Sequence, residues 1–450
     1  MKSTRSGIIL FLFMIMVLSS ACVVSGTGGA PAPTPFIITA TADSIADMSV
    51  FLTQTAVVVP TAEPEAHTLP ATLRLVYTDT SGNLYSWTQA DGVRPLLASG
   101  DILGARLSDD GLWAAFTRST DYLHYSLWVI GFDGSGEREL VTQDQLMALK
   151  NHADAVGAEP YIFSWIPGSH TLAFNTSPRF EGPGLLVNDD LHLVNAETGA
   201  LSTLLAPGDG GIFYYSPDGS QIALVTPENI SLINADGSNR RNNVLVYDPV
   251  LTYSEYQYYA APQWSSDGSF LRVAIPPQAS LDNPGEMTTL WHLPTDGSAA
   301  GVAGHVLTAP LTSVTISPDL GWIAYQSTIG DGSDNRRDLH INTITGSNDV
   351  IYASGEVNLD TWAPDSVHFV YTDRASSQTR YANKDGGEVL LIPAGTVMNM
   401  HFVDEFTYIY LKDGGGQWEI YHGNLDGTQT MIASMPKPIG GRFPNYSFIN

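Results

Sequence analysis

The feature that most constrains this fold is a short turn motif that recurs along the chain from Leu73 onward. It reads Ser-Pro-Asp-Gly or a close variant, and an apolar, alternating strand follows it. Proline presets the first turn dihedral, aspartate hydrogen-bonds its own backbone, and glycine accepts a positive φ, so each copy predicts a hairpin between two strands. Clear copies span 108–116, 216–224, 265–275 and 317–325, and weaker copies span 165–174, 362–371 and 402–411.

A second motif, a strand that ends in a small polar turn, accompanies the first. The pair recurs at roughly 40 to 58 residues, the period of β-propeller blades. Copies of the second motif lie at 84–92, 127–136, 191–199, 230–238, 290–298, 339–347 and 420–427. The paired motifs resemble the TolB-like propeller repeat, and the resemblance covers residues 73–450. It implies an all-β propeller domain over 72–450, but it carries no function across.

The number of blades follows from counting the strands that begin each blade. Seven first motifs each begin a blade, whereas residues 73–98 hold three strands and a second motif without an opening strand. The last nine residues, 442–450, have the character of that missing strand. We therefore predict eight four-stranded antiparallel blades, with the C-terminal strand closing the first blade and removing an open sheet edge. Seven blades is the alternative.

The N-terminus has the organisation of an export signal. Lys2 and Arg5 precede an apolar run over 8–18, which is too short to span a bilayer comfortably, and small residues lead into Cys22. The segment resembles a bacterial lipoprotein signal, which implies removal of residues 1–21 and lipidation of Cys22. Ser19 departs from the leucine usual three residues before that cysteine. An ordinary signal peptide with a chance cysteine is the alternative.

Residues 22–71 have the composition of a tether. After Cys22 the segment is rich in Thr, Ala, Pro and Gly and holds no Lys or Arg, which predicts an extended linker with at most a short helix over 41–55. A lipid on Cys22 would anchor the protein to the cell membrane or outer membrane. The expected location is therefore extracytoplasmic, in the periplasm or on the cell surface.

Charge and cysteine content narrow the possible partners. Acidic residues outnumber basic ones by 46 to 20, for a net charge of −26. Such a chain repels nucleic acid and anionic lipid, so we expect no nucleic-acid partner and no electrostatic membrane contact. A single cysteine allows neither an intramolecular disulfide nor a cysteine metal site. We predict no metal site and no cofactor.

One face of the disc is expected to carry the function. Both motifs close short turns on one face, so the other connections open on the opposite face, and every long insertion falls among them. These insertions span 142–160, which includes a predicted short helix around 146–156, and 175–190, 244–259, 276–287 and 328–338. We therefore expect any ligand on this face.

The candidate binding residues come from these insertions. Five tyrosines in 244–259 have the chemistry of a stacking platform for sugar rings or a peptide, although packing between blades would explain them equally. Neighbouring insertions contribute an acid and two arginines. The candidates are Tyr247, Tyr253, Tyr256, Tyr258, Tyr259, Glu286, Arg336 and Arg337.

Two histidines resemble metal ligands only superficially. His192 and His340 fall near the repeat position that Tyr85, Trp128, Trp291 and Tyr421 fill elsewhere. A position that accepts Tyr, Trp or His is a packing position, so we predict packing between blades and not metal binding.

No nucleophile elbow, zinc-binding helix or phosphate-binding loop occurs in the sequence. Our leading hypothesis is a non-enzymatic, membrane-anchored propeller that binds an envelope protein, a peptide or a glycan through its long-loop face. Two alternatives remain: an envelope assembly scaffold like TolB, and an enzyme resembling polysaccharide lyases that use His, Arg and a divalent ion in the central funnel.

Overall fold

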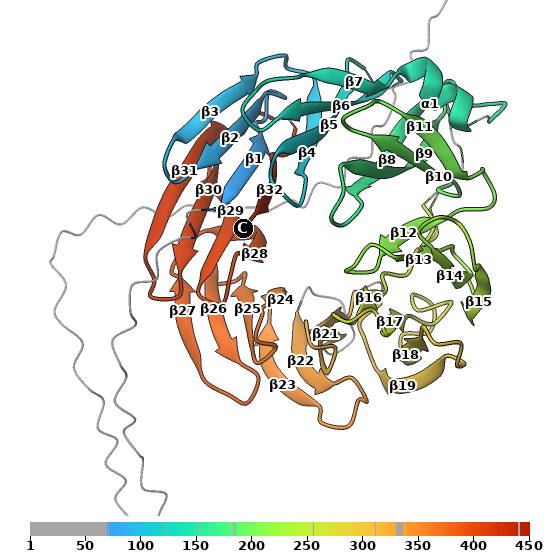
Figure 1. Ribbon diagram of the computed structural model, residues 1–450. Coiled ribbons are helices and arrows are strands. Elements are labelled where there is room, and N and C mark those ends of the chain that lie inside the picture. Colours follow the sequence, from blue (N-terminus) through green and yellow to red (C-terminus); the bar gives the residue numbers. More distant parts are fainter. Residues whose placement is uncertain are drawn as a thin grey trace, which may run out of the picture. The chain divides into compact units, whose positions relative to one another are not determined.

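The computed structural model describes residues 70, 72–121, 123–150, 152–182, 184, 186–254, 256–310, 312–329, 336–439 and 442–450. These residues form eight four-stranded antiparallel sheets, arranged as blades around a common centre (Figure 1). The prediction of an eight-bladed propeller is confirmed, and the seven-bladed alternative is wrong.

The blades are numbered in chain order, and their first strands lie nearest the centre (Figure 1). Blade 1 holds β32 (Asn445–Ile449), β1 (Arg74–Thr78), β2 (Leu84–Thr88) and β3 (Gly92–Leu97). Blade 2 holds β4 (Ile102–Leu107), β5 (Trp113–Ser119), β6 (Tyr125–Gly131) and β7 (Arg138–Val141). Blade 3 holds β8 (Gly157–Trp165), β9 (Thr171–Arg179), β10 (Leu191–Asn195) and β11 (Leu201–Leu205). Blade 4 holds β12 (Ile212–Tyr215), β13 (Gln221–Val225), β14 (Asn229–Asn234) and β15 (Arg241–Val246).

The second half of the ring repeats this plan. Blade 5 holds β16 (Gln263–Trp264), β17 (Phe270–Ile275), β18 (Thr288–Pro294) and β19 (Gly301–Val306). Blade 6 holds β20 (Thr315–Ile316), β21 (Trp322–Thr328), β22 (Arg337–Thr343) and β23 (Val350–Gly355). Blade 7 holds β24 (Val357–Trp362), β25 (His368–Asp373), β26 (Gln378–Asn383) and β27 (Glu388–Ile392). Blade 8 holds β28 (Thr396–Phe402), β29 (Thr407–Asp413), β30 (Gln417–Asn424) and β31 (Gln429–Pro436).

The two ends of the propeller meet in blade 1, as predicted. Strand β32 pairs antiparallel with β1 over five residues, from Thr78 opposite Asn445 to Arg74 opposite Ile449. Tyr446 is 7% exposed and packs in the cluster between blades 8 and 1. Its hydroxyl donates to the carbonyl oxygens of Asn399 and Ile409 in blade 8. The last strand therefore joins the first blade to the last one.

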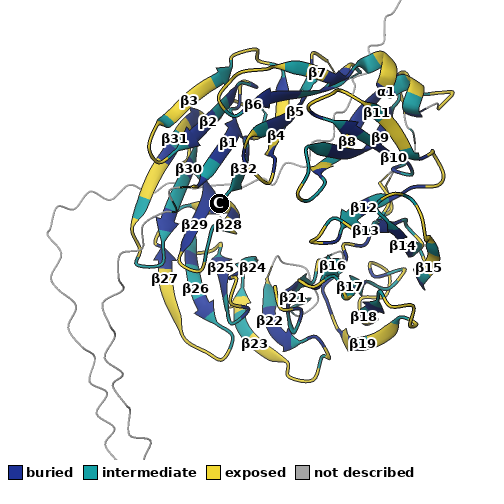
Figure 2. Cartoon of the chain, in the orientation of Figure 1, coloured by how far each residue is buried: buried dark blue, intermediate teal, exposed yellow. Residues whose placement is uncertain are grey.

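The core is divided among the gaps between blades. Each pair of neighbouring blades encloses its own cluster of buried hydrophobic residues, which gives eight clusters around the ring. In three of these gaps, a tryptophan at the end of a first strand donates a hydrogen bond from its indole N–H to a backbone carbonyl of the preceding blade. Trp165 donates to the carbonyl of Arg106 at 3.1 Å, Trp264 to Tyr214 at 3.0 Å and Trp362 to Thr315 at 3.2 Å. The outermost strands such as β3 and β27 are largely exposed (Figure 2).

The first motif forms the same hydrogen-bonded turn wherever it is complete. In blade 4, the Ser216 hydroxyl donates to Asp218 at 2.6 Å and accepts from the Gln221 N–H at 3.0 Å. The hydroxyls of Ser216 and Ser220, with the Ser220 N–H, lower the pKa of Asp218 to about 2. The next position of the turn is glycine, because Gly219 has φ +69°, a left-handed conformation that glycine adopts without strain. The residues of the repeated motif therefore stabilise a turn, as the sequence predicts.

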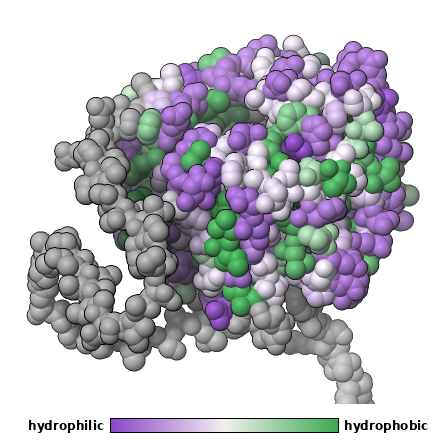
Figure 3. Space-filling view, turned by 90° about the horizontal axis from the view of Figure 1, so that it is seen from below, coloured by the Kyte–Doolittle hydropathy of each residue, from purple (hydrophilic) through white to green (hydrophobic). Residues whose placement is uncertain are grey.

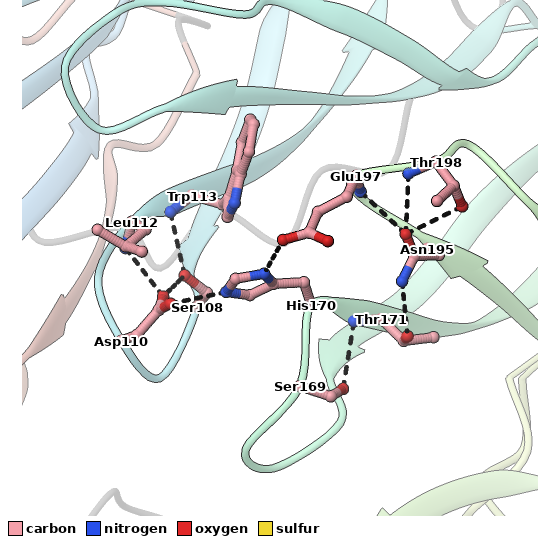
Figure 4. Close-up of polar contacts among 10 residues, drawn as sticks. All are labelled: Ser108, Asp110, Leu112, Trp113, Ser169, His170, Thr171, Asn195, Glu197 and Thr198. Carbon is pink, nitrogen blue, oxygen red and sulfur yellow. Dashed lines mark hydrogen bonds and ion pairs between the residues drawn. The ribbon is translucent and has the colours of Figure 1, made fainter.

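Two motif turns are joined by a histidine that the sequence did not single out. His170 of blade 3 lies with Nε2 2.6 Å from Asp110 in the blade 2 turn and with Nδ1 2.6 Å from Glu197 (Figure 4). Only the protonated imidazole can donate to both carboxylates at once. Hydrogen bonds to Asp110 and Glu197 accordingly raise the pKa of His170.

Helix α1 (Gln143–Lys150) lies in the connection from blade 2 to blade 3. It begins earlier than the predicted helix around 146–156 and ends at Lys150. The Lys150 ammonium is buried and lies 3.0 Å from the Asp189 carboxylate, and it also donates to the Val187 carbonyl. Within the described ranges, no helix is long and apolar enough to cross a membrane.

Candidate functional site

The long connections gather on one face, which we call the loop face. Because strands alternate in direction, the links between second and third strands and the links between blades all open there, whereas both motifs turn on the opposite face. The longest links on the loop face are 142–156, 180–190, 247–262 and 276–287. On the side of the propeller that Figure 3 shows, hydrophilic residues are interspersed with small groups of hydrophobic ones.

A cavity of about 400 Å³, which we call the tyrosine cavity, lies beside blade 5. The link between blades 4 and 5 forms one wall, β17 and β18 contribute another, and the link into blade 6 contributes the third. Its lining residues are Tyr258, Tyr259, Ala261, Gln263, Ala274, Pro276, Thr288, Thr312, Ser313, Val314, Thr315 and Ile316. These lining residues combine aromatic rings, aliphatic groups, hydroxyls and one amide, and none of the described ones is Asp, Glu, Lys, Arg or His.

Two further cavities adjoin the tyrosine cavity. The loop cavity, of about 450 Å³, is enclosed by Pro227 and the link between blades 4 and 5, and it shares Tyr258 with the tyrosine cavity. The inner cavity, of about 530 Å³, shares Ala261 and Gln263 with it. The other walls of the inner cavity come from the first strands β8 and β12, including Trp165 and Tyr215. The three cavities therefore follow one stretch of chain, 249–264, from the loop face to the inner wall of the ring.

The loops around these cavities are held together. The Leu251 N–H donates to the Gln278 carbonyl at 2.8 Å, and the Tyr253 hydroxyl donates to Asp282. Both contacts join the link between blades 4 and 5 to the connection between β17 and β18. Tyr253 also has φ +54°, a conformation that bulky residues rarely adopt and that is found disproportionately at functional sites.

The five predicted tyrosines separate into two groups. Tyr247, Tyr258 and Tyr259 are partly buried against the hydrophobic cluster between blades 4 and 5, which matches the packing alternative. Tyr253 and Tyr256 are exposed, at 62% and 57%. Yet Tyr258 and Tyr259 also line the tyrosine cavity, and Tyr253, Tyr256 and Tyr258 line the loop cavity. Packing and cavity lining are thus combined in the same segment.

Burial changes the acidity of the packed tyrosines. Desolvation raises the pKa of Tyr258 to about 12, and its hydroxyl donates to the Ala274 carbonyl at 3.3 Å. Burial also raises the pKa of Tyr259. Both phenols are therefore neutral at ordinary pH, and they offer hydrogen bonds without charge.

The remaining candidates lie elsewhere. Glu286 is exposed in the connection between β17 and β18, and Arg336 and Arg337 stand at the start of β22. None of the three is among the described residues that line the three cavities. Cys22, the signal segment and the predicted tether helix lie outside the described residues.

The two histidines pack against aromatic rings of their own blades, and their predicted packing between blades stays a prediction. His192 is fully buried beside Phe174, and the His340 ring stacks on Tyr325 with 4.7 Å between centroids. The Nε2 atom of His340 lies 2.8 Å from the Ser327 hydroxyl, and its Nδ1 atom lies 3.0 Å from Asp349.

This serine, histidine and aspartate array has a structural explanation. Asp349 also accepts a hydrogen bond from the Tyr325 hydroxyl at 2.8 Å. Tyrosines at the same position of the second strand make the same kind of contact in the next two blades. The Tyr371 hydroxyl donates a hydrogen bond to Glu388 in blade 7, and the Tyr410 hydroxyl donates one to Gln429 in blade 8. We therefore assign the array to blade packing. Among the residues that the structure describes, no group of three or more His, Asp or Glu is arranged to hold a metal ion.

Sequence reasoning missed most of the tyrosine cavity. Gln263, Thr288 and the 312–316 stretch carry no motif, and they become neighbours only because blades 5 and 6 are adjacent. It also missed Asp360, the extra residue of a bulge in the innermost strand of blade 7, whose pKa desolvation raises to about 7. Asp360 receives a hydrogen bond from Thr372 at 2.6 Å.

The sequence matches no known family profile and no curated protein. Solved structures with a similar fold include an oligogalacturonate lyase in complex with manganese (TM-score 0.41, 14% identity, 71% of this chain and 90% of that one). Another is a prolyl endopeptidase (TM-score 0.47, 12% identity), of whose chain the match covers 50% and of this chain 75%. A third is an oligogalacturonate lyase from Vibrio parahaemolyticus (TM-score 0.40, 12% identity, 71% of this chain and 90% of that one).

Proposed function

We propose that this protein is a non-catalytic binding module and that the tyrosine cavity is its ligand site. One observation carries the proposal. The described residues that line this cavity on the loop face offer rings, hydroxyls and an amide without a single formal charge, in a chain whose net charge is −26. Cavities that combine apolar walls with a few polar groups are the usual form of small-ligand sites.

The uncharged lining selects the kind of ligand. A charged group moved from water into this cavity would lose hydration and find no opposite charge, which costs several kcal/mol, on the order of the penalty for burying an unpaired ion. The overall negative charge further disfavours anionic ligands such as uronate polymers. By contrast, the larger cavity of about 650 Å³ at the rim of blades 6 and 7 includes Lys384, Asp385 and Glu388. The ligand of the tyrosine cavity is therefore neutral.

The test fills the cavity. Ser313 is exposed at the lining, so Ser313→Trp places a large ring in the cavity at little cost to the fold. Ser202→Trp, on the exposed outer strand β11, is the matched control. The purified full chain is screened against neutral glycans, acidic glycans and peptides. A neutral ligand that binds the parent and the control, but binds Ser313→Trp at least tenfold more weakly, supports the site. Equal binding by both variants would refute it.

We also propose that the propeller is lipid-anchored outside the cytoplasm through Cys22. The support is the sequence of residues 1–22, with its positive start, apolar run and single cysteine. Metabolic labelling with an alkyne fatty acid should mark the parent chain and leave Cys22→Ser unlabelled. Labelling of both would rule out this anchor.

A further inference from the structure

We infer that the ligand is a linear neutral oligosaccharide that extends from the loop face through the tyrosine cavity to the inner wall of the ring. The inference rests on the proposed function and specifies its ligand class. It starts from adjacency: the tyrosine cavity shares the lining residue Tyr258 with the loop cavity, and it shares Ala261 and Gln263 with the inner cavity. A single sugar unit would occupy one cavity, whereas a linear chain uses all three.

The lining chemistry fits a sugar along this whole path. Aromatic rings recur in each cavity, with Tyr253 and Tyr256 in the loop cavity, Tyr258 and Tyr259 in the tyrosine cavity, and Trp264 in the inner cavity. The negative face of an aromatic ring attracts the positively polarised C–H bonds on the apolar face of a pyranose. Each ring can therefore act as a platform for one sugar unit.

Hydroxyl and amide groups lie between these rings. Gln257 lines the loop cavity, Gln263 lies where the tyrosine and inner cavities meet, and Ser313 and Thr315 line the tyrosine cavity. Such groups both donate and accept hydrogen bonds, as sugar hydroxyls do. None of the described lining residues of the three cavities is charged, so peptides with ionised side chains or termini find no counter-charge along the path.

The path is also largely preformed. The link between blades 4 and 5 is tied to the β17–β18 connection by the Leu251 amide and by the Tyr253 hydroxyl. The hydroxyl of the partly buried Tyr247 donates to the Thr226 carbonyl at 2.6 Å and fixes the start of the same link. A rigid site does not have to order its loops on binding, which preserves affinity for a flexible chain.

The experiment titrates the purified full chain with cello-, malto- and chito-oligosaccharides of increasing length. Calorimetry gives the affinity, and tryptophan fluorescence reports the inner cavity, because Trp165 and Trp264 line it. We expect at least one series to bind more tightly as the chain lengthens, by about tenfold from the shortest binder to the plateau. Only chains long enough to reach the inner cavity should change the fluorescence.

Two variants locate the ends of the path. Ala261→Phe, at an exposed residue shared by the tyrosine and inner cavities, adds bulk without a new tryptophan, and it should abolish the fluorescence change and the gain from added length while retaining binding of short chains. Tyr253→Ala should weaken long chains about three- to tenfold, the worth of one stacked ring. Ser202→Trp should leave both readouts unchanged.

The outcomes separate this inference from the proposed function. Affinity that is independent of length, or a ligand that proves to be a peptide or acidic glycan blocked by Ser313→Trp, would overturn the linear neutral glycan and leave the tyrosine cavity as the site. Failure of all three oligosaccharide series to bind would also overturn it. A ligand unaffected by Ser313→Trp would refute the site itself.

Discussion

Closure of the ring by its last strand can be tested at a single side chain. Tyr446 lies on β32, is 7% exposed, and fills the gap between blades 8 and 1 while its hydroxyl donates to two blade 8 carbonyls. Tyr446→Ala removes a buried ring, which costs about 3–5 kcal/mol for aromatic residues in protein cores. Tyr446→Phe keeps the ring and removes the hydrogen bonds, and should cost about 1 kcal/mol.

The assay is urea unfolding followed by circular dichroism, with midpoints compared across variants. Tyr256→Ala is the matched control, because this tyrosine is 57% exposed and its loss should change stability by less than about 0.5 kcal/mol. The expected order of midpoints is parent and control together, then Tyr446→Phe, then Tyr446→Ala. Equal midpoints for Tyr446→Ala and Tyr256→Ala would show that β32 does not close blade 1.

Three further predictions concern the motif turns and the paired contacts of His170 with Asp110 and Glu197, which we call the histidine brace. Ser216→Ala should destabilise the fold by about 1 kcal/mol and raise the pKa of Asp218 from about 2 toward its ordinary value, as measured by carboxyl NMR titration; an unchanged pKa would contradict the turn network. Because contact with Asp110 and Glu197 raises the pKa of His170, its contribution should be complete below its unfolded value near 6.5 and lost as pH rises through the folded pKa. His170→Ala should therefore cost about 1 kcal/mol at pH 6 and almost nothing at pH 9 in urea unfolding, and an equal cost at both would refute the brace. Asp110→Asn should remove part of the same pH dependence, and a pH profile identical to the parent's would exclude the Asp110 contact.

The fold was predictable because it repeats. Turn chemistry at Ser216, Asp218 and Gly219 is local, so it can be read from adjacent residues, and seven copies left one blade incomplete. The incomplete blade then left one pairing site for the C-terminal strand, beside Arg74–Thr78. Conversely, the tyrosine cavity joins Tyr258, Thr288 and Ser313, which are far apart in the sequence. The motifs fix which strands pair, but they do not fix which loop side chains meet.

The sequence indicated which loop is rich in aromatic residues, but it did not indicate which of their side chains are buried or what they contact. The excess of tyrosines in 244–259 pointed to a loop that lines two of the cavities, because aromatic residues in a long insertion need either a packing partner or a ligand. It did not separate the partly buried Tyr247 from the exposed Tyr256. His170 was missed for a similar reason, since its partners Asp110 and Glu197 belong to two turns brought together only by adjacent blades.

The central claim is that the tyrosine cavity holds a neutral ligand. The most direct measurement is a crystal structure of the full chain with the longest oligosaccharide that binds it. Our account predicts sugar density between Tyr258 and the 312–316 stretch, continuing past Ala261 toward Trp264. Density confined to the face opposite the loop face or to the outer rim, with the tyrosine cavity empty, would contradict it.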